Sequence, residues 1–275
     1  MKKLLPTTLL SLGLITAAHA DDWCQHKADR SSSVDATGAR KIIIGAGAGD
    51  LKVGGSPGQT AVQAKGQACA SSEELLGQIQ LESRREGDTV YLKTVLPDTS
   101  EGMLAFSHYA RLDLTVSIPA TVPVELEDSS GDLELKNVQS ATVADGSGDA
   151  DIADIHGNLQ VTDSSGDLKI RTVSGNVSVT DSSGDLEIKD VQGDIDIPID
   201  SSGDIRITQA RSVHIHNDSS GDIVIHRVAN DVRVDRDSSG DINVDDIGGN
   251  FSVGADSSGS IHHDKVSGTV LLPQK

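Results

Sequence analysis

The sequence predicts an all-β protein, a single-stranded parallel β-solenoid (β-helix) with coils of about 18 residues. The pentapeptide Asp-Ser-Ser-Gly-Asp occurs six times unchanged, and near copies begin at Asp145 and Asp256. Neighbouring copies are 17 to 19 residues apart, and the residues between them alternate between apolar and polar twice per period. Such a regular period is typical of one structural unit per copy, stacked on its neighbours.

Each period contains two short alternating segments that we expect to be strands. After the pentapeptide that begins at Asp181, Leu186 and Ile188 alternate with polar residues, and so do Ile195 and Ile197. Alternation places these four side chains on one face of their strands. That face should form the interior, and stacked coils should form parallel sheets with strands about 4.8 Å apart.

Two corners complete each coil. One is the pentapeptide itself. The other is a Gly-Asn or Gly-Asp pair between the two strands, which we expect to adopt the positive φ that a sharp bend requires. These pairs are Gly157-Asn158, Gly175-Asn176, Gly193-Asp194 and Gly249-Asn250.

The segment before the array follows the same pattern less strictly. Gly-Asp-Leu-Lys-Val at residues 49–53 and Ala-Val-Gln-Ala at 61–64 predict irregular first coils over residues 41–67. A helical turn is predicted after an N-cap at Ser71 or Ser72. Residues 89–96 and 111–118 alternate and predict strands. We therefore divide the chain into a signal peptide (1–20), an irregular N-terminal solenoid and cap region (21–123) and a regular solenoid of pentapeptide repeats (124–275).

The first twenty residues indicate export. Lys2 and Lys3 precede an apolar stretch over residues 4–18, and Ala-His-Ala at 18–20 predicts cleavage between Ala20 and Asp21. The apolar stretch is too short for a bilayer span, and we expect no transmembrane segment. The periplasm is the expected location, with the cell surface or secretion as alternatives.

Cys24 and Cys69 are the two cysteines of the chain, and an oxidising compartment would let them pair. We expect this disulfide to attach a ragged N-terminal segment, residues 21–33, to the first coil.

The formal charge is −19, and loss of Lys2 and Lys3 with the signal peptide would leave −21. Nucleic acid and anionic membrane surfaces are therefore poor partners, whereas divalent cations or cationic partners suit this charge.

Stacking of the pentapeptides should align their first and fifth aspartates in two carboxylate ladders. Neighbouring charges about 4.8 Å apart repel by roughly 0.9 kcal/mol in water, so something must offset this repulsion. Each carboxylate could accept backbone N–H groups two or three residues on, with help from the serines. Alternatively, Ca²⁺ could lie between successive coils. No other cofactor is expected. The candidate calcium ligands are Asp128, Asp132, Asp163, Asp167, Asp181, Asp185, Asp200, Asp204, Asp218, Asp222, Asp237 and Asp241.

Histidines offer a second candidate metal site. His214 and His216 are two residues apart and should share the outward face of one strand, where zinc could bind them with Asp235 or a mobile side chain as third ligand. Two exposed surface histidines are the simpler interpretation. His262 and His263 should point to opposite faces and make a weaker site.

A polysaccharide-processing enzyme is a further alternative, because such enzymes occur on parallel β-helices. Catalysis needs a convergent group of acids, bases or nucleophiles, whereas the acids here form rows. Substrate-stacking aromatic residues are also expected, yet Trp23, Tyr91 and Tyr109 all precede the array. We therefore expect a protein that is not an enzyme.

The signal peptide, residues 49–53, Ser-Ile-Pro-Ala-Thr-Val-Pro-Val at 117–124 and the Ser-Ser-Gly-Asp-Leu/Ile repeats together resemble a known family. It comprises bacterial β-strand-repeat proteins catalogued as "putative adhesins", a domain class of unknown function. The resemblance covers nearly all of the mature chain. It implies an exported, non-catalytic binding or structural scaffold whose partner is an unknown protein or glycan of the envelope.

Overall fold

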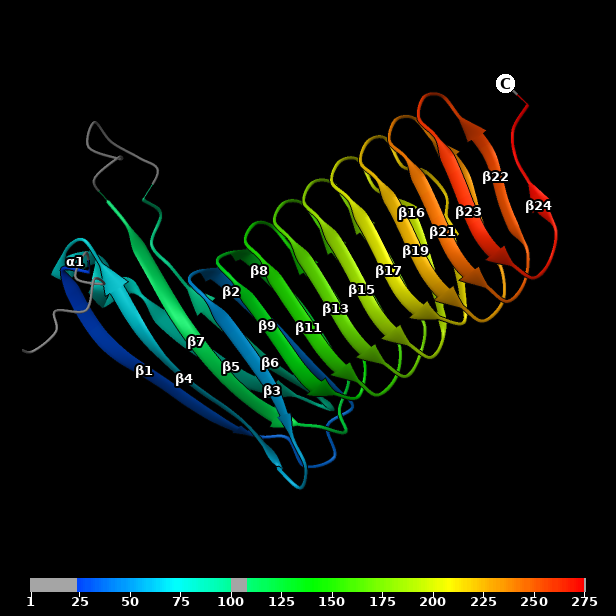
Figure 1. The fold of residues 1–275 in the computed structure, drawn as a ribbon. Helices are drawn as coiled ribbons and strands as arrows, with labels where there is room; N and C mark the ends of the chain where they lie inside the picture. The colour runs from blue at the N-terminus through cyan, green and yellow to red at the C-terminus, as the bar shows by residue number, and fades with distance from the viewer. Residues whose placement is uncertain (1–23, 100–107, 275) are drawn as a thin grey trace, which may run out of the picture.

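The computed structural model describes residues 24–99 and 108–274. The predicted signal peptide and its cleavage site at Ala20 and Asp21 lie outside the described residues, as does Trp23. Two twelve-stranded sheets face each other across one continuous apolar core (Figure 1). The predicted parallel β-solenoid is confirmed.

Each coil of the regular array adds one strand to each sheet. One sheet contains β9 (Leu133–Val138), β11 (Ala150–Ile155), β13 (Leu168–Val173), β15 (Leu186–Val191), β17 (Ile205–Ala210), β19 (Ile223–Val228), β21 (Ile242–Ile247) and β23 (Ile261–Val266). The facing sheet contains β8 (Val124–Ser130), β10 (Ala141–Asp145), β12 (Leu159–Asp163), β14 (Val177–Asp181), β16 (Asp194–Ile199), β18 (Ser212–Ile215), β20 (Val232–Asp237), β22 (Phe251–Asp256) and β24 (Val270–Leu271).

The strands pair in parallel, so that equivalent residues of successive coils stand beside each other. Leu168 pairs with Leu186, and Ile170 pairs with Ile188. The predicted inward face is confirmed, because Leu186, Ile188 and Ile197 are fully buried. Columns of aliphatic side chains therefore run along the interior, and each column is shared between neighbouring coils.

The order of the coils in space differs from their order in the chain. β2 (Lys41–Ala48) pairs in parallel with both β8 and β6 (Thr89–Val95). β3 (Leu51–Ser56) lies in the same way between β9 and β7 (Ala110–Pro119). The coil formed by β2 and β3 is thus inserted between the regular array and a coil that comes later in the chain.

The prediction for residues 41–67 was right for β2 and β3 and wrong for the rest. Residues 61–67 belong to β4 (Ala61–Ala70), which runs antiparallel to β1 (His26–Asp35) and β7. Alternation predicts that a segment is a strand, but the sheet edge within reach of the chain decides its partner and direction. β1 also corrects the expectation of a ragged segment over residues 21–33, because its residues form a regular strand.

Antiparallel strands and one short helix cap the N-terminal end. β5 (Gln80–Glu86) covers the edge of β6 in one sheet, and β1 is the edge strand of the other sheet. In the helix α1 (Glu73–Gln78), the Ser72 hydroxyl caps the first turn by accepting the Leu75 N–H at 3.2 Å. A disulfide joins Cys24 to Cys69 in β4, as predicted.

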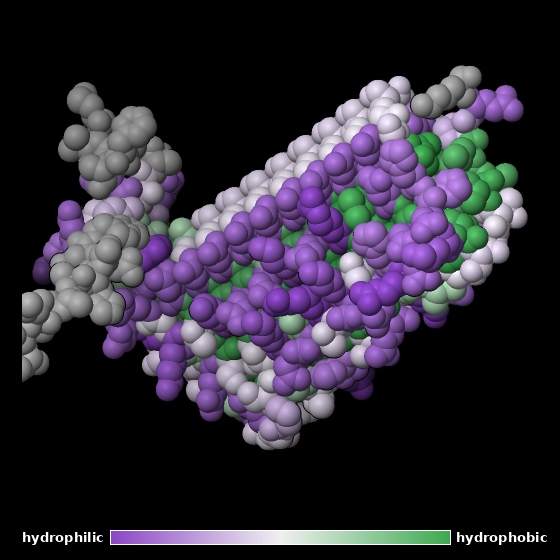
Figure 2. All heavy atoms as spheres, in the orientation of Figure 1, coloured by the Kyte–Doolittle hydropathy of each residue, from purple (hydrophilic) through white to green (hydrophobic). Residues whose placement is uncertain are grey.

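The opposite end of the solenoid has a different surface. Leu271 and Leu272 beside the last coil are 62% and 41% exposed, and hydrophobic residues gather at this end in Figure 2. Along the array the same view shows rows of hydrophilic side chains. Nowhere in residues 24–99 and 108–274 does a helix have the length and apolar character to cross a membrane.

The structure corrects the predicted backbone at the Gly-Asn corners. Positive φ occurs instead near the end of the preceding strand, for example at Thr172 with φ 57°. Gly175 is needed for space, because a Cβ there would lie 2.6 Å from the Gly157 carbonyl oxygen of the coil before. The pentapeptide glycines do adopt positive φ, between 119° and 136°.

Candidate functional site

The first aspartates of the pentapeptides form a buried column, which we call the inner ladder. They lie at, near or just after the ends of strands in the β8 to β22 sheet, and all except Asp256 of the last copy are no more than 4% exposed. The inner ladder comprises Asp128, Asp145, Asp163, Asp181, Asp200, Asp218 and Asp237.

Burial is the main perturbation of the inner ladder, and the charge of the neighbouring carboxylate adds to it. Together they raise the pKa of Asp128, Asp200 and Asp218 to about 7. The pKa values of Asp145 and Asp181 rise to about 6. Several of these side chains are therefore partly neutral near pH 7, which makes the real charge of the folded protein less negative than the formal count.

Two members of the inner ladder make the predicted local hydrogen bond. Asp163 accepts the Ser165 N–H at 3.3 Å, and Asp181 accepts the Ser183 N–H at 3.2 Å. Both carboxylate oxygens of Asp200 lack a hydrogen-bond partner among the described residues. Burial removes water from this carboxylate and so disfavours the anion, which is the main physical reason for the raised pKa of Asp200.

The fifth aspartates form an outer ladder that is more accessible to solvent. In each coil Oδ1 accepts the backbone N–H of the equivalent residue one coil further on, as Asp167 does from Asp185 at 3.2 Å. The expected partner was a backbone group two or three residues on, but stacking brings the next coil's N–H closer. The outer ladder comprises Asp132, Asp149, Asp167, Asp185, Asp204, Asp222 and Asp241, and it extends through Asp50 to Asp113.

The serines of the corner also bond between coils. The second serine hydroxyl donates to a carbonyl oxygen of the coil before, as Ser183 does to Ser164 at 3.1 Å and Ser220 to Ser201 at 3.2 Å. The polar groups of the corner therefore hold the stack together. Its two carboxylates face different environments, one buried and one partly exposed, so calcium binding by the twelve predicted aspartates stays a prediction.

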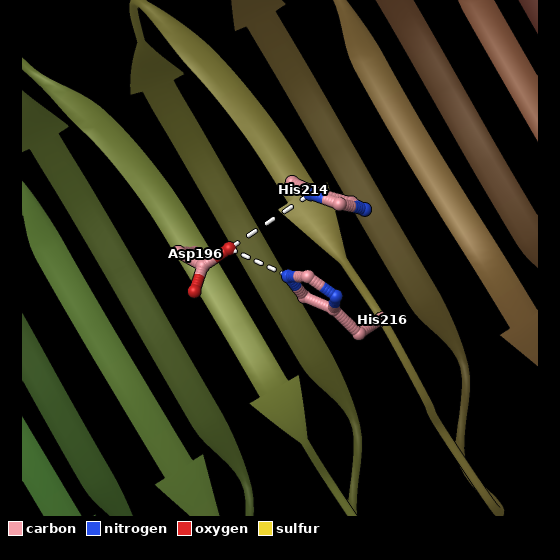
Figure 3. A group of neighbouring side chains, drawn as sticks. All are labelled: Asp196, His214 and His216. Carbon is pink, nitrogen blue, oxygen red and sulfur yellow. Dashed lines mark hydrogen bonds and ion pairs between the residues drawn. The ribbon is translucent and has the colours of Figure 1, made fainter.

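A separate cluster lies on the outer face of the β16, β18 and β20 strands (Figure 3). His214 in β18 and His216 just after it stack with ring centroids 3.8 Å apart. Asp196 in β16 lies on one side of the pair, with Oδ1 2.7 Å from His216 Nε2 and 3.9 Å from His214 Nδ1. Asp235 in β20 lies on the other side, with Oδ2 2.9 Å from His214 Nε2.

This cluster was only partly predicted. The expected pair and Asp235 are together, but sequence reasoning missed Asp196 as a ligand. The signal was available in the repeat, because equal spacing aligns Asp196 with His214 in the neighbouring coil, and the structure has this register. Arg233 also donates to Asp235 from the same strand.

The outer face of the opposite sheet carries ion pairs along its length. Glu134 accepts from Lys136 at 2.7 Å, and Arg206 donates to Asp204 at 2.7 Å.

The two tyrosines have partners in the cap, because Arg84 lies over the Tyr91 ring and the Tyr109 hydroxyl accepts the Gln25 N–H. Neither tyrosine is beside the acidic ladders of the regular array.

The chain is similar to several solved structures and to one protein family. Solved structures similar to this chain include one called a "putative lipid binding protein" from Parabacteroides distasonis, at 15% identity and a TM-score of 0.47, covering 90% of this chain and 97% of that one. "Putative adhesins" from Bacteroides fragilis (17% identity, TM-score 0.41, covering 90% and 97%) and Parabacteroides merdae (13%, 0.40, covering 91% and 97%) are also similar. No curated protein matches.

A match to a protein-family model relates this chain to known sequences more directly than the structural similarity does. The model described as Toastrack DUF4097 matches residues 56–270, which include β4 and all coils of the regular array. The match covers most of the sequence, and the chain belongs to this Toastrack family of unknown function.

Proposed function

We propose that the protein is an exported, non-catalytic scaffold that binds a protein or glycan partner in the bacterial envelope. The observation that carries this proposal is that the pentapeptides serve to stack the coils. Their aspartates, serines and glycines bond or pack against the next coil, so the repeated motif builds a rod and leaves two long outer sheet faces for binding.

The outer faces have the character of a recognition surface. Parallel pairing fixes the spacing of their side chains, and surfaces built on rigid elements hold those positions accurately. Mixed charges cover the face of the β9 to β23 sheet, where Lys189 lies beside Glu187 and Lys136 beside Glu134. The negative formal charge favours a cationic partner or a glycan over nucleic acid.

Catalysis is less well supported by the geometry. The carboxylates are distributed along two ladders, whereas an acid–base mechanism requires them to converge on one bound substrate. We therefore expect no turnover of acidic polysaccharides. Hydrolysis or β-elimination that a single Asp→Asn substitution abolishes would contradict the proposal.

Export and binding can be tested together. The full chain, with residues 1–20, is expressed in a bacterium, and the cells are fractionated. The mature protein should begin at Asp21 and should appear outside the cytoplasm. The purified protein then captures partners from the native envelope after cross-linking. A face variant, Lys169→Glu with Lys189→Glu, should lose a partner that the wild type retains. Retention of the protein in the cytoplasm would contradict export. Capture of the same set of molecules by the wild type and by the face variant would contradict binding by this face.

A further inference from the structure

The Asp196, His214 and His216 side chains meet on a rigid part of the fold. β16, β18 and β20 are neighbouring parallel strands, and Asp196 stands directly beside His214 in the register. All three side chains are partly exposed, between 34% and 47%, so a solute can reach them. The backbone of Asp196 and His214 is paired with a strand on each side, and just after β18 the His216 N–H donates to the Ile197 carbonyl oxygen at 2.8 Å. Such a backbone positions side chains more accurately than a loop would.

The distances suit a small divalent ion. One ligand atom from each residue lies within 4.8 Å of the others, and Asp196 Oδ1 is 2.7 Å and 3.9 Å from the two imidazole nitrogens that face it. Tetrahedral Zn²⁺ with bonds near 2.0 Å holds its ligand atoms roughly 3.3 Å apart. The two Asp196 separations lie on both sides of that value and the two imidazole nitrogens lie within 4.8 Å of each other, so side-chain rotations would be enough to complete the geometry.

Asp235 contributes from the opposite side of the pair. Its carboxylate lies 2.9 Å from His214 Nε2, the nitrogen that faces away from Asp196. Histidine ligands of metals almost always donate their other ring N–H to a carboxylate or a carbonyl, which fixes the ring and makes the ligating nitrogen more basic. His214 is already held in this way.

We propose that Asp196, His214 Nδ1 and His216 Nε2 bind a divalent first-row transition metal ion such as Zn²⁺, with Asp235 as the residue that orients His214. Two imidazoles and one carboxylate suit zinc, copper or nickel, whereas calcium and magnesium prefer oxygen ligands throughout. Three protein ligands on an open surface leave a fourth position for water or for a group of a bound partner.

Arg233 limits the affinity of this site. It donates to Asp235 and places a positive charge beside the cluster. The substitution Arg233→Gln should therefore tighten metal binding, whereas a site unrelated to this cluster would not respond to it.

The test is a calorimetric titration of the full chain, purified without a histidine tag and stripped with a chelator, using Zn²⁺ alone near pH 7.5. We expect one bound ion per chain and a higher melting temperature with zinc. His216→Ala and Asp196→Asn should each weaken binding by about tenfold or more. The matched control is His156→Ala, which removes a surface histidine that bonds to Asn137 in another coil.

Substitution with Co²⁺ adds a spectroscopic readout, because a site with nitrogen and oxygen ligands gives visible absorption that should disappear in His216→Ala. Melting in the presence of the chelator should be the same for wild type and variants, which shows that the variants fold. Absence of zinc binding by the wild type, or equal affinity in His216→Ala and His156→Ala, would overturn the proposal.

Discussion

Asp222 and Asp241 belong to successive coils, and Oδ1 of Asp222 accepts the backbone N–H of Asp241 at 2.9 Å. The same contact recurs along the solenoid from Asp113 to Ser260 and crosses the junction where the coil of β2 and β3 is inserted. A side chain thus completes the backbone hydrogen bonding at the corner, where the strands themselves have ended.

Removal of this acceptor should destabilise the stack. Asp222→Ala leaves the Asp241 N–H without its partner, and loss of a hydrogen bond to a charged group typically costs about 1 to 3 kcal/mol. Asp222→Asn keeps an acceptor oxygen and should lose much less, as Asn158 and Asn176 already fill such a role at the other corner. Thermal melts of the three proteins measure the difference, and equal melting of Ala and Asn variants would contradict this account.

A methyl group at the pentapeptide glycine should be far more disruptive. Gly166 has φ 123°, and a Cβ there would lie 1.8 Å from the Gly148 carbonyl oxygen. Gly166→Ala combines backbone strain with a clash that a paired backbone cannot relieve, so we expect a loss of about 4 kcal/mol or more. Gly54→Ala is the matched control, because a Cβ at Gly54 meets open space. A Gly166→Ala protein that melts like the control would refute the close stacking.

The inner ladder should make stability depend on pH. Burial and then the charges of Asp218 and Asp181 raise the pKa of Asp200 from 3.8 to about 7, so the folded state favours the neutral acid. A raised acid pKa contributes stability that is complete below pH 3.8 and is lost as the pH rises through about 7. The melting temperature should therefore fall as the pH rises from about 4 to about 7 and change little above that.

Asp200→Asn imitates the neutral acid and should flatten this dependence. Its melting temperature should exceed that of the wild type near pH 8 and approach it only near pH 4. Asp241→Asn, in the outer ladder, should keep the wild-type dependence. Parallel curves for wild type and Asp200→Asn would show that Asp200 does not titrate as its burial requires.

Calcium binding by the aspartates has its own test. The outer ladder is the accessible one, and each of its carboxylates uses Oδ1 for the backbone, as Asp167 does. If Ca²⁺ binds there, calorimetry should detect weak binding in the millimolar range and the melting temperature should rise. Asp167→Asn with Asp185→Asn should remove both effects, while His216→Ala should keep them. No heat and no change in melting would exclude calcium at these ladders.

The alternation of apolar and polar residues and the near-constant period predicted the solenoid, its inward face and its two corners. These features depend on short-range rules, since a side chain such as Leu186 points inward whenever its neighbours in the strand point outward. The Ser72 N-cap and the Cys24–Cys69 disulfide could be predicted for similar reasons, from a local motif and from the number of cysteines.

Tertiary structure decided which segments became neighbours. The insertion of β2 and β3 between β8–β9 and β6–β7, and the antiparallel pairing of β4, depend on sheet edges brought together from distant parts of the chain. The burial of Asp200 and the partnership of Asp196 with His216 likewise arise only when coils stack. A repeat determines the shape of one coil from its own residues, but the environment of each polar side chain is determined by the coil beside it.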